Sequence, residues 1–553
     1  MRRLAIIAGL ALAGSGLRGQ GTVELPPMMV EETVSSAPWL YVSVGGAEFL
    51  SRCSDSTTRQ FVEAWLEKMQ LVQALVPAEF LPRSDVPTLL VLYSQNLQQT
   101  VSAEIQRELQ GAEGRAAPRG DRVNIAPNMR LTDRDLHASI VYLDEAQFNA
   151  AGLSIAPGHV RFLLKGRVPE LPAWLVDGVE RIWRDADFVL DPITIRPLVW
   201  LDARESAALA SDAQRPRALL PAGELFAPEP ARAVENRHPR RAEIRAAQQE
   251  LFFRWALLGG AATRAALWRL AARAAEGPVT EDVFEQCFGF GFADLRDRLS
   301  DYLPKAVKET QWIKPGPPPP AADFAVTRAT PNQVARIRGE WERLAIAHVQ
   351  RRLPQVREPY IAQARRTLRR AFDAGDRDPR LLATMGLVEL DAGNAAGARQ
   401  YLDPACAAGV PRPRAHHELA WLRFAELRRD TPETKLFSFT ELAPVLEPLR
   451  RAAQLAPPLP EAFALLGEAW ARCELAPNAA ELAELGAGAR AFVHNPAVAW
   501  PIAAAYARHG RPAEALAALE ACAGYPADEA TAAGIARLRA GLAGAAPRLL
   551  NGK

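Results

Sequence analysis

The chain has 553 residues, of which 49% are hydrophobic and 24% are charged, as is usual for a protein with large buried cores. With 66 basic and 64 acidic side chains, its net charge of +2 gives no excess of positive charge for nucleic acid or an anionic membrane. The five cysteines are widely spaced without a Cys-x-x-Cys pair, which argues against a cysteine metal cluster and a dense disulfide framework.

Residues 1–20 have the form of a signal peptide. Arg2 and Arg3 precede an apolar run that ends at Ala13, small residues follow, and the cleavage site is expected between Ala13 and Gly19. This run is too short to cross a bilayer, so we expect cleavage after it and export to the periplasm or the medium. The alternative is that it forms a buried strand or helix of the mature protein. No other stretch approaches an apolar run of about 18 residues, so we expect no integral membrane span.

Strand and helix signals follow in the next hundred residues. Residues 39–44 are β-branched and aromatic and end at a pair of glycines, which predicts a strand and a turn. Residues 56–76 carry large apolar side chains at three- to four-residue spacing and precede a proline, which predicts an amphipathic helix. The apolar stretches 87–93 and 139–143 predict further strands.

A further apolar stretch, Leu171–Trp183, begins with Leu-Pro and continues AWLVDGVERIW. Trp174, Val179 and Ile182 recur at helical spacing, so we expect a helix with one face in the core. An acid, Asp177, precedes a glycine within it. The stretch resembles the Leu-Pro-x-Trp-Leu-x-Glu-Gly-x-Ala segment of gluzincin (peptidase-MA-like) zinc peptidases. In that family the segment follows the His-Glu-x-x-His helix and supplies the third zinc ligand.

The zinc ligands of that family are missing here. Such a site needs two histidines four residues apart on a helix, a glutamate between them and a downstream carboxylate. The upstream segment in register is 156–164, where Pro157, Gly158 and Arg161 replace the His, Glu and His. Asp177 stands where the ligand Glu is expected. The resemblance therefore implies an inactive peptidase fold, with these four positions as vestiges and no bound metal or other cofactor.

The rest of this first domain is expected to be mostly helical. We predict an extended stretch over 185–202 and a long mobile loop over 203–245, which is polar and contains prolines. Helical patterns then occupy 246–258, 263–275, 284–289 and 292–303. This order of features is similar to the α+β layout of gluzincin domains, and the resemblance covers residues 35–305.

A proline-rich segment, 311–330, is expected to form a stiff, extended linker between domains. From 331 to 550 the chain is rich in alanine and helical in pattern. Four prolines recur there at separations of 34, 47 and 36 residues, and a small residue follows each of them after seven positions. The prolines are Pro379, Pro413, Pro460 and Pro496, and the small residues are Gly386, Ala420, Gly467 and Ala503.

This period resembles the tetratricopeptide repeat, whose paired helices touch closely where a side chain is small. Gly393 and Gly510 fall at the turns between paired helices, and Ala398 and Ala515 at the small position of the second helix. The 47-residue separation predicts an insertion around residues 429–435. The sequence therefore predicts an all-α tetratricopeptide solenoid after the α+β domain.

The repeat register predicts which side chains line the concave groove. Exposed tryptophan and arginine on such a face suit peptide capture through stacking and charge-assisted hydrogen bonds, and for each residue alone an ordinary packed or solvated helix surface is the competing interpretation. In this register the sequence His416-His-Glu-Leu-Ala-Trp421 is a repeat helix and not a zinc motif. The predicted groove residues are Arg414, His417, Trp421, Glu468, Arg472, Trp500 and Arg508.

We therefore expect an exported, non-catalytic protein whose solenoid binds protein or peptide, with no nucleic-acid partner. One alternative is an active zinc-dependent hydrolase with a non-standard ligand set, in which His159 and Asp177 hold the metal with a ligand from elsewhere. In that register Leu163 falls at the second ligand position. His137, the other histidine near this region, is interpreted as a lone surface or core residue. A further alternative is a purely structural role, with the old cleft kept as an assembly surface.

Overall fold

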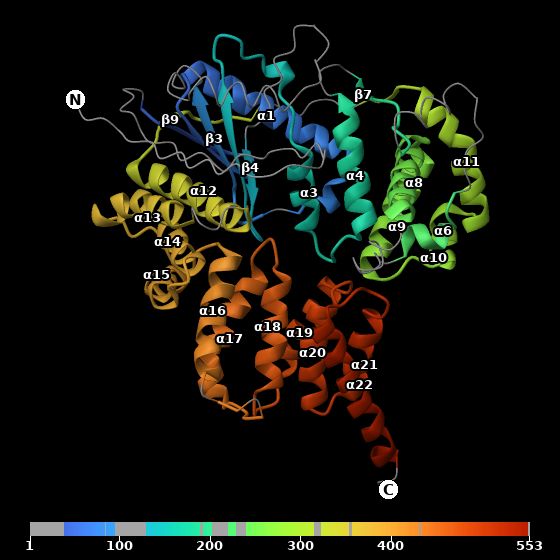
Figure 1. The fold of residues 1–553 in the computed structure, drawn as a ribbon, viewed down its shortest axis with the longest axis vertical. Coiled ribbons are helices and arrows are strands. Elements are labelled where there is room, and N and C mark those ends of the chain that lie inside the picture. The colour runs from blue at the N-terminus through green and yellow to red at the C-terminus, as the bar shows by residue number, and fades with distance from the viewer. Residues whose placement is uncertain are drawn as a thin grey trace, which may run out of the picture.

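The computed structural model describes residues 38–94, 129–187, 192–201, 219–227, 239–314, 322–352 and 357–550, apart from 83, 430 and 433. The expected signal peptide lies outside these residues. Within them, no helix combines the length and the apolar character needed to cross a membrane. Figure 1 shows an N-terminal α+β part and, beneath it in this view, a curved array of helices that ends at the C-terminus.

A six-stranded sheet forms the N-terminal part, in the order β4-β5-β3-β2-β1-β9. β1 and β2 form a hairpin whose two-residue turn, Gly45 and Gly46, has φ values of 60° and 74°, which explains the glycine pair. β2, β3 and β5 run parallel to one another. The strands are β1 (Leu40–Val44), β2 (Ala47–Ser51), β3 (Thr88–Ser94), β4 (Met129–Thr132), β5 (His137–Leu143) and β9 (Thr327–Arg328), and the covering helices are α1 (Asp55–Leu75) and α12 (Pro331–Arg352).

Both faces of this sheet are buried, as the central strand β3 illustrates. Leu90 and Leu92 belong to the core that also contains α1. Leu89 and Val91, on the opposite face, belong to the core that contains α12. A strand that is buried on both faces needs an uninterrupted apolar run, and β3 has one. The predicted strands and the first helix are confirmed.

Helices α3 and α4 follow the sheet and pack against each other, and α4 also packs against α8. Trp174, Val179 and Ile182 of α4 are buried as predicted. Gly178 has a packing role, because a Cβ atom there would lie 2.9 Å from Phe253 of α8. The helices of this region are α3 (Pro157–Lys165), α4 (Ala173–Asp185), α6 (Ala222–Phe226), α8 (Pro239–Leu258), α9 (Ala261–Glu276), α10 (Glu281–Phe288) and α11 (Phe292–Lys308).

The predicted long loop over 203–245 is wrong where the structure describes it. Helix α6 lies within it, and α8 begins at Pro239 rather than near residue 246. Proline breaks a helix in its interior. Pro239 is instead the first residue of α8, where no backbone hydrogen-bond donor is needed. The extended stretch over 185–202 contains the short strands β6 (Ala186–Asp187) and β7 (Ile193–Ile195) of a second sheet.

The described ends of the proline-rich segment 311–330 are strands. β8 (Gln311–Ile313) joins β7 in the three-stranded sheet, and β9 adds to the edge of the six-stranded sheet beside β1. Residues 315–321 of this segment lie outside the described part of the chain. The chain therefore returns to the first sheet before the helical array begins.

The C-terminal part consists of paired helices, as predicted. The four recurring prolines are the first residues of α14, α16, α18 and α20, and Gly393 and Gly510 form turns with φ values of 81° and 73°. The helices are α13 (Arg357–Asp373), α14 (Pro379–Asp391), α15 (Ala395–Ala407), α16 (Pro413–Arg428), α17 (Phe439–Gln454), α18 (Pro460–Ala471), α19 (Ala479–Ala491), α20 (Pro496–Arg508), α21 (Pro512–Ala521) and α22 (Glu529–Leu550).

The small residues lie at close helix contacts. A Cβ atom on Gly386 would lie 2.6 Å from Leu402 of the paired helix α15. At Gly467 the close neighbour is instead α20, because its Cβ atom would lie 2.7 Å from the backbone nitrogen of Ile502. The inserted residues fall in the connection between α16 and α17, where Phe437 makes a parallel bridge with Cys473.

One hydrophobic core joins the two parts. It extends from β3 through α12, Leu368 of α13 and Leu382 of α14 to Leu419 of α16. The array then curves beneath α3 and α4 (Figure 1) and touches the N-terminal part again. The backbone nitrogen of Glu170 donates to the oxygen of Ala491 at 2.8 Å, and that of Asp85 donates to the oxygen of Ala456 at 2.8 Å.

Candidate functional site

The four positions that the sequence resemblance singled out, Pro157, Gly158, Arg161 and Asp177, lie on α3 and α4. Pro157 begins α3, and open space surrounds the position of Gly158. Arg161 donates to Asp177 Oδ1 at 2.5 Å and also pairs with Glu180. Burial would lower the pKa of Arg161, but these two carboxylates raise it overall. The guanidinium group of Arg161 therefore pairs with two carboxylates that both belong to α4.

His159 lies in a different environment from Asp177. Its ring is buried against Trp65 and against His137, with a distance of 4.6 Å between the two imidazole centroids. Ser139 Oγ lies 3.3 Å from His137 Nε2. Burial lowers the pKa of His159 to about 4, and the nearby Arg130 adds to this effect. The sequence did not reveal the pair, because no local pattern connects the start of a strand with a helix that follows a loop.

The cavity beside this histidine pair measures about 30 Å³, which is room for water and not for a substrate. Arg130 contributes to its lining. A positive charge there opposes the binding of a metal cation. Among the residues that the structure describes, no three or more His, Cys, Asp and Glu side chains are grouped so that they could hold a metal ion.

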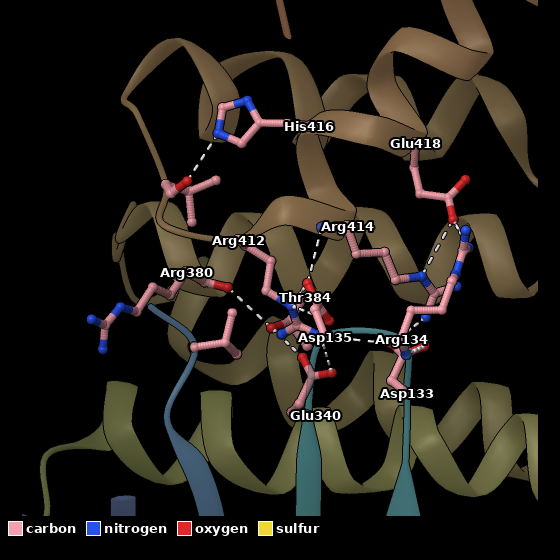
Figure 2. A network of polar contacts seen from close by, with 12 residues as sticks. Asp133, Arg134, Asp135, Glu340, Arg380, Thr384, Arg412, Arg414, His416 and Glu418 are labelled. Atoms are coloured by element: carbon pink, nitrogen blue, oxygen red, sulfur yellow. Dashed lines mark hydrogen bonds and ion pairs between the residues drawn. The ribbon is translucent and has the colours of Figure 1, made fainter. Parts of the chain in front are cut away.

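A cluster of charged side chains lies at the junction of the sheet and the helical array (Figure 2). The turn between β4 and β5 carries Asp133, Arg134 and Asp135 into the N-terminal ends of the array helices. Arg412 donates to the two oxygens of Asp135 at 3.1 and 3.0 Å, and to Glu340 of α12 at 3.1 Å. Asp135 is fully buried and also accepts from the backbone nitrogen of Arg414 at 2.9 Å.

The arginines of the cluster favour the ionised forms of Glu340 and Asp133. Burial alone would raise the pKa of Glu340, but Arg343 and Arg412 lower it to about 2. For Asp133, likewise, burial is opposed by Arg343 and Arg414, and the net pKa lies well below its usual value. Buried charges that have several partners of opposite sign fix the geometry of a junction. This cluster therefore holds the array against the sheet.

The junction covers part of the predicted groove. Arg414 is buried with Asp133 and Asp391, and His417 is also buried. Trp421, one turn further along α16, is 47% exposed. Of the other predicted groove residues, Glu468 pairs with Arg428, and Arg472 donates to the backbone oxygens of Pro432 and Lys435. Trp500 lies close to Gly534 of α22, and Arg508 is exposed. The structure thus places Arg414 and His417 in the interior and leaves Trp421 and Arg508 accessible.

A cleft of about 520 Å³ opens between α3 and the start of α18. Gly158 and Arg161 line one wall, and residues 457–461 line the other. Arg134 links this cleft to the groove, because it pairs with Glu418 of α16 and lies 3.8 Å from Glu461. The apolar and charged side chains of the lining are Phe162, Leu163, Leu459, Phe492, Asp133, Arg134, Arg161, Lys165, Glu170 and Glu461.

The cleft has both charged and apolar side chains in its lining. Burial raises the pKa of Glu170, with Lys165 acting in the opposite direction. Arg161 and Arg134 already have acidic partners within the protein. A chain with mixed apolar and polar groups is a better match to this surface than a small ion, since the pocket volume lies in the range of organic ligands.

Comparison with protein families and with curated protein sequences finds no match. Among solved structures, the chain is similar to the crystal structure of the P58(IPK) TPR domain, with 13% sequence identity and a TM-score of 0.14. That match covers 63% of this chain and 99% of the other.

Proposed function

We propose that this protein is an exported, non-catalytic relative of gluzincin peptidases that binds a peptide or protein segment. The observation that carries the proposal is the cleft of about 520 Å³ with the vestigial Gly158 and Arg161 on one wall and the start of α18 on the other. A bound segment would lie in this cleft and continue along α16 to the exposed Trp421.

The ion pair of Arg161 with Asp177 and Glu180 supports the non-catalytic part of the proposal. A guanidinium cannot lose its charge near neutral pH, so it repels a divalent cation from the carboxylate that would have been the third ligand. The alternative is a zinc hydrolase that uses His159 and Asp177. To bind the metal, His159 would have to break its contact with His137, and Asp177 its ion pair with Arg161.

Metal analysis separates these alternatives. After dialysis against zinc, we expect the purified full chain to retain no stoichiometric metal, and Asp177→Asn to change neither metal content nor peptidase activity. One zinc ion per chain, lost in the Asp177→Asn variant, would establish the hydrolase alternative and refute ours.

Peptide binding is tested with peptides selected from a random display library against the full chain. We expect Trp421→Ala to weaken binding about tenfold or more, since buried tryptophan contacts dominate many peptide interfaces. Melting should be unchanged, because Trp421 is 47% exposed. The matched control is Trp312→Ala in β8, where an equally large side chain is 66% exposed. Equal losses in the two variants would contradict the proposed site.

A further inference from the structure

A second large cavity, of about 670 Å³, lies at the opposite edge of the six-stranded sheet. It is formed where β9, α12 and α13 meet, and it shares no lining residue with the cleft beside α3. We call it the arginine pocket, because Arg328 of β9, Arg338 of α12 and Arg370 of α13 line it.

Among the lining residues that the structure describes, none is acidic. The acid beside Arg338 is Glu342, which lies 3.5 Å from it and is itself mostly buried. Three guanidinium groups from three separate elements therefore lie at one concave surface, and the one of Arg338 also pairs with Glu342. In a chain whose net charge is only +2, this is a local asymmetry and attracts anions.

Apolar side chains complete the pocket, chiefly Trp39, Val334 and Pro331. Trp39 is only 8% exposed, and the guanidinium groups of Arg52 and Arg338 lie 4.7 and 5.9 Å from its ring centroid. The volume is far larger than an inorganic anion needs. An occupant with carboxylates and apolar groups suits this combination better.

The pocket also adjoins a sheet edge. β9 is the last strand of the six-stranded sheet, and both of its residues, Thr327 and Arg328, are exposed. An edge strand presents backbone groups with which an extended chain can pair. An occupant that pairs with β9 would run beside Arg328 and bring alternate side chains over the pocket.

We propose that the arginine pocket binds an extended acidic peptide segment of a protein partner, whose carboxylates pair with Arg328, Arg338 and Arg370. Guanidinium groups form bidentate, charge-assisted hydrogen bonds with carboxylates, and apolar side chains of the same segment would cover Trp39. This site is independent of the cleft in the proposed function, and either could exist without the other.

The test uses a fluorescein-labelled peptide of alternating glutamate and valine, measured by fluorescence anisotropy with the intact chain. We expect saturable binding that weakens with salt, and a peptide of alternating lysine and valine should not bind. Arg328→Gln and Arg370→Gln should each weaken binding about tenfold. Both arginines are exposed, so these variants should fold, and unchanged melting curves would verify it.

The matched control is Arg369→Gln. It removes the same charge from the neighbouring residue of α13, but Arg369 acts on Glu389 of α14 and does not line the pocket. If Arg369→Gln and Arg370→Gln weakened binding equally, the peptide would be held by nonspecific electrostatic attraction to the protein surface, and the proposal would be overturned. Absence of binding to the intact chain would also overturn it. So would binding that needs removal of residues 21–37, since Glu31 and Glu32 would then be the natural occupants.

Discussion

Arg412, at the start of an array helix, donates hydrogen bonds to both carboxylate oxygens of Asp135, which lies 277 positions earlier in the chain. Both side chains are almost completely buried. Because both side chains are shielded from water, each charge depends on the other residue for its hydrogen bonds. The contact therefore forms only when the sheet and the array are packed together. We infer that the sheet and the first helix pairs of the array fold as one unit.

Arg412→Met should therefore destabilise the protein strongly. The substitution keeps most of the side-chain volume but leaves Asp135 and Glu340 buried without this cation, and such losses typically cost about 3–5 kcal/mol. Urea denaturation of the full chain measures the effect. The control is Arg423→Met, whose pair with Asp403 is 23% and 35% exposed, and which should cost less than about 1 kcal/mol. Similar losses in both variants would show that the junction is not fixed by this contact.

The buried histidine pair predicts a loss of stability in mild acid. The pKa of His159 is about 4 in the folded protein against an ordinary value of 6.5, so the unfolded chain binds the proton more readily. The contribution of neutral His159 to the free energy of unfolding is complete above pH 6.5 and is lost as the pH falls toward 4. The loss between pH 7 and pH 5 amounts to about 2 kcal/mol. Burial also lowers the pKa of His137.

Denaturation at a series of pH values checks this, with His159→Phe as the comparison. The variant should show a flatter dependence between pH 7 and pH 5. The acids of the junction do not confuse the result, because the pKa of Glu340 is lowered from 4.5 to about 2, and its effect is lost only below pH 4.5. An unchanged slope in His159→Phe would rule out this histidine as the source.

Gly467→Ala tests a close contact between two helices of the array, α18 and α20. Its new methyl group would lie 2.7 Å from the nitrogen of Ile502 and 2.8 Å from the carbonyl carbon of Pro501, both in the backbone of α20. Overpacking of this kind costs about 1–3 kcal/mol, and leucine should cost more. Gly158→Ala is the control, since no atom lies within 4 Å of its new methyl group. Calorimetry in which Gly158→Ala did the greater damage would refute the contact.

Secreted material tests the expected export. N-terminal sequencing of protein recovered outside the cytoplasm should begin between residues 14 and 22, because the apolar run of the signal segment ends at Ala13. Recovery with Met1 intact would contradict the prediction.

Features with local causes could be predicted from the sequence. Gly45 and Gly46 are needed by a tight turn, Pro413 and Pro460 begin helices, and the apolar run of β3 follows from burial on both faces. The repeat register also placed the small residues at helix contacts. In each case the neighbours in sequence determine the structure.

Features with distant causes could not be predicted. Asp135 and Arg412 look like surface residues in their own segments, and only tertiary packing buries them together. For the same reason, the register assigned Arg414 to a groove face without revealing that the turn between β4 and β5 covers it. The proximity of His137 and His159 likewise depends on how α3 packs against the sheet.

The return of the chain through β9, before the helical array begins, has a consequence for covalent continuity. The core and the ion pairs that join the array to the sheet do not depend on an unbroken peptide chain between β8 and β9. A protease site introduced at residues 315–321 should therefore yield two polypeptides that migrate together in gel filtration and separate only in denaturant. Dissociation of the cut halves in native buffer would show that the tether, and not the junction, keeps them together.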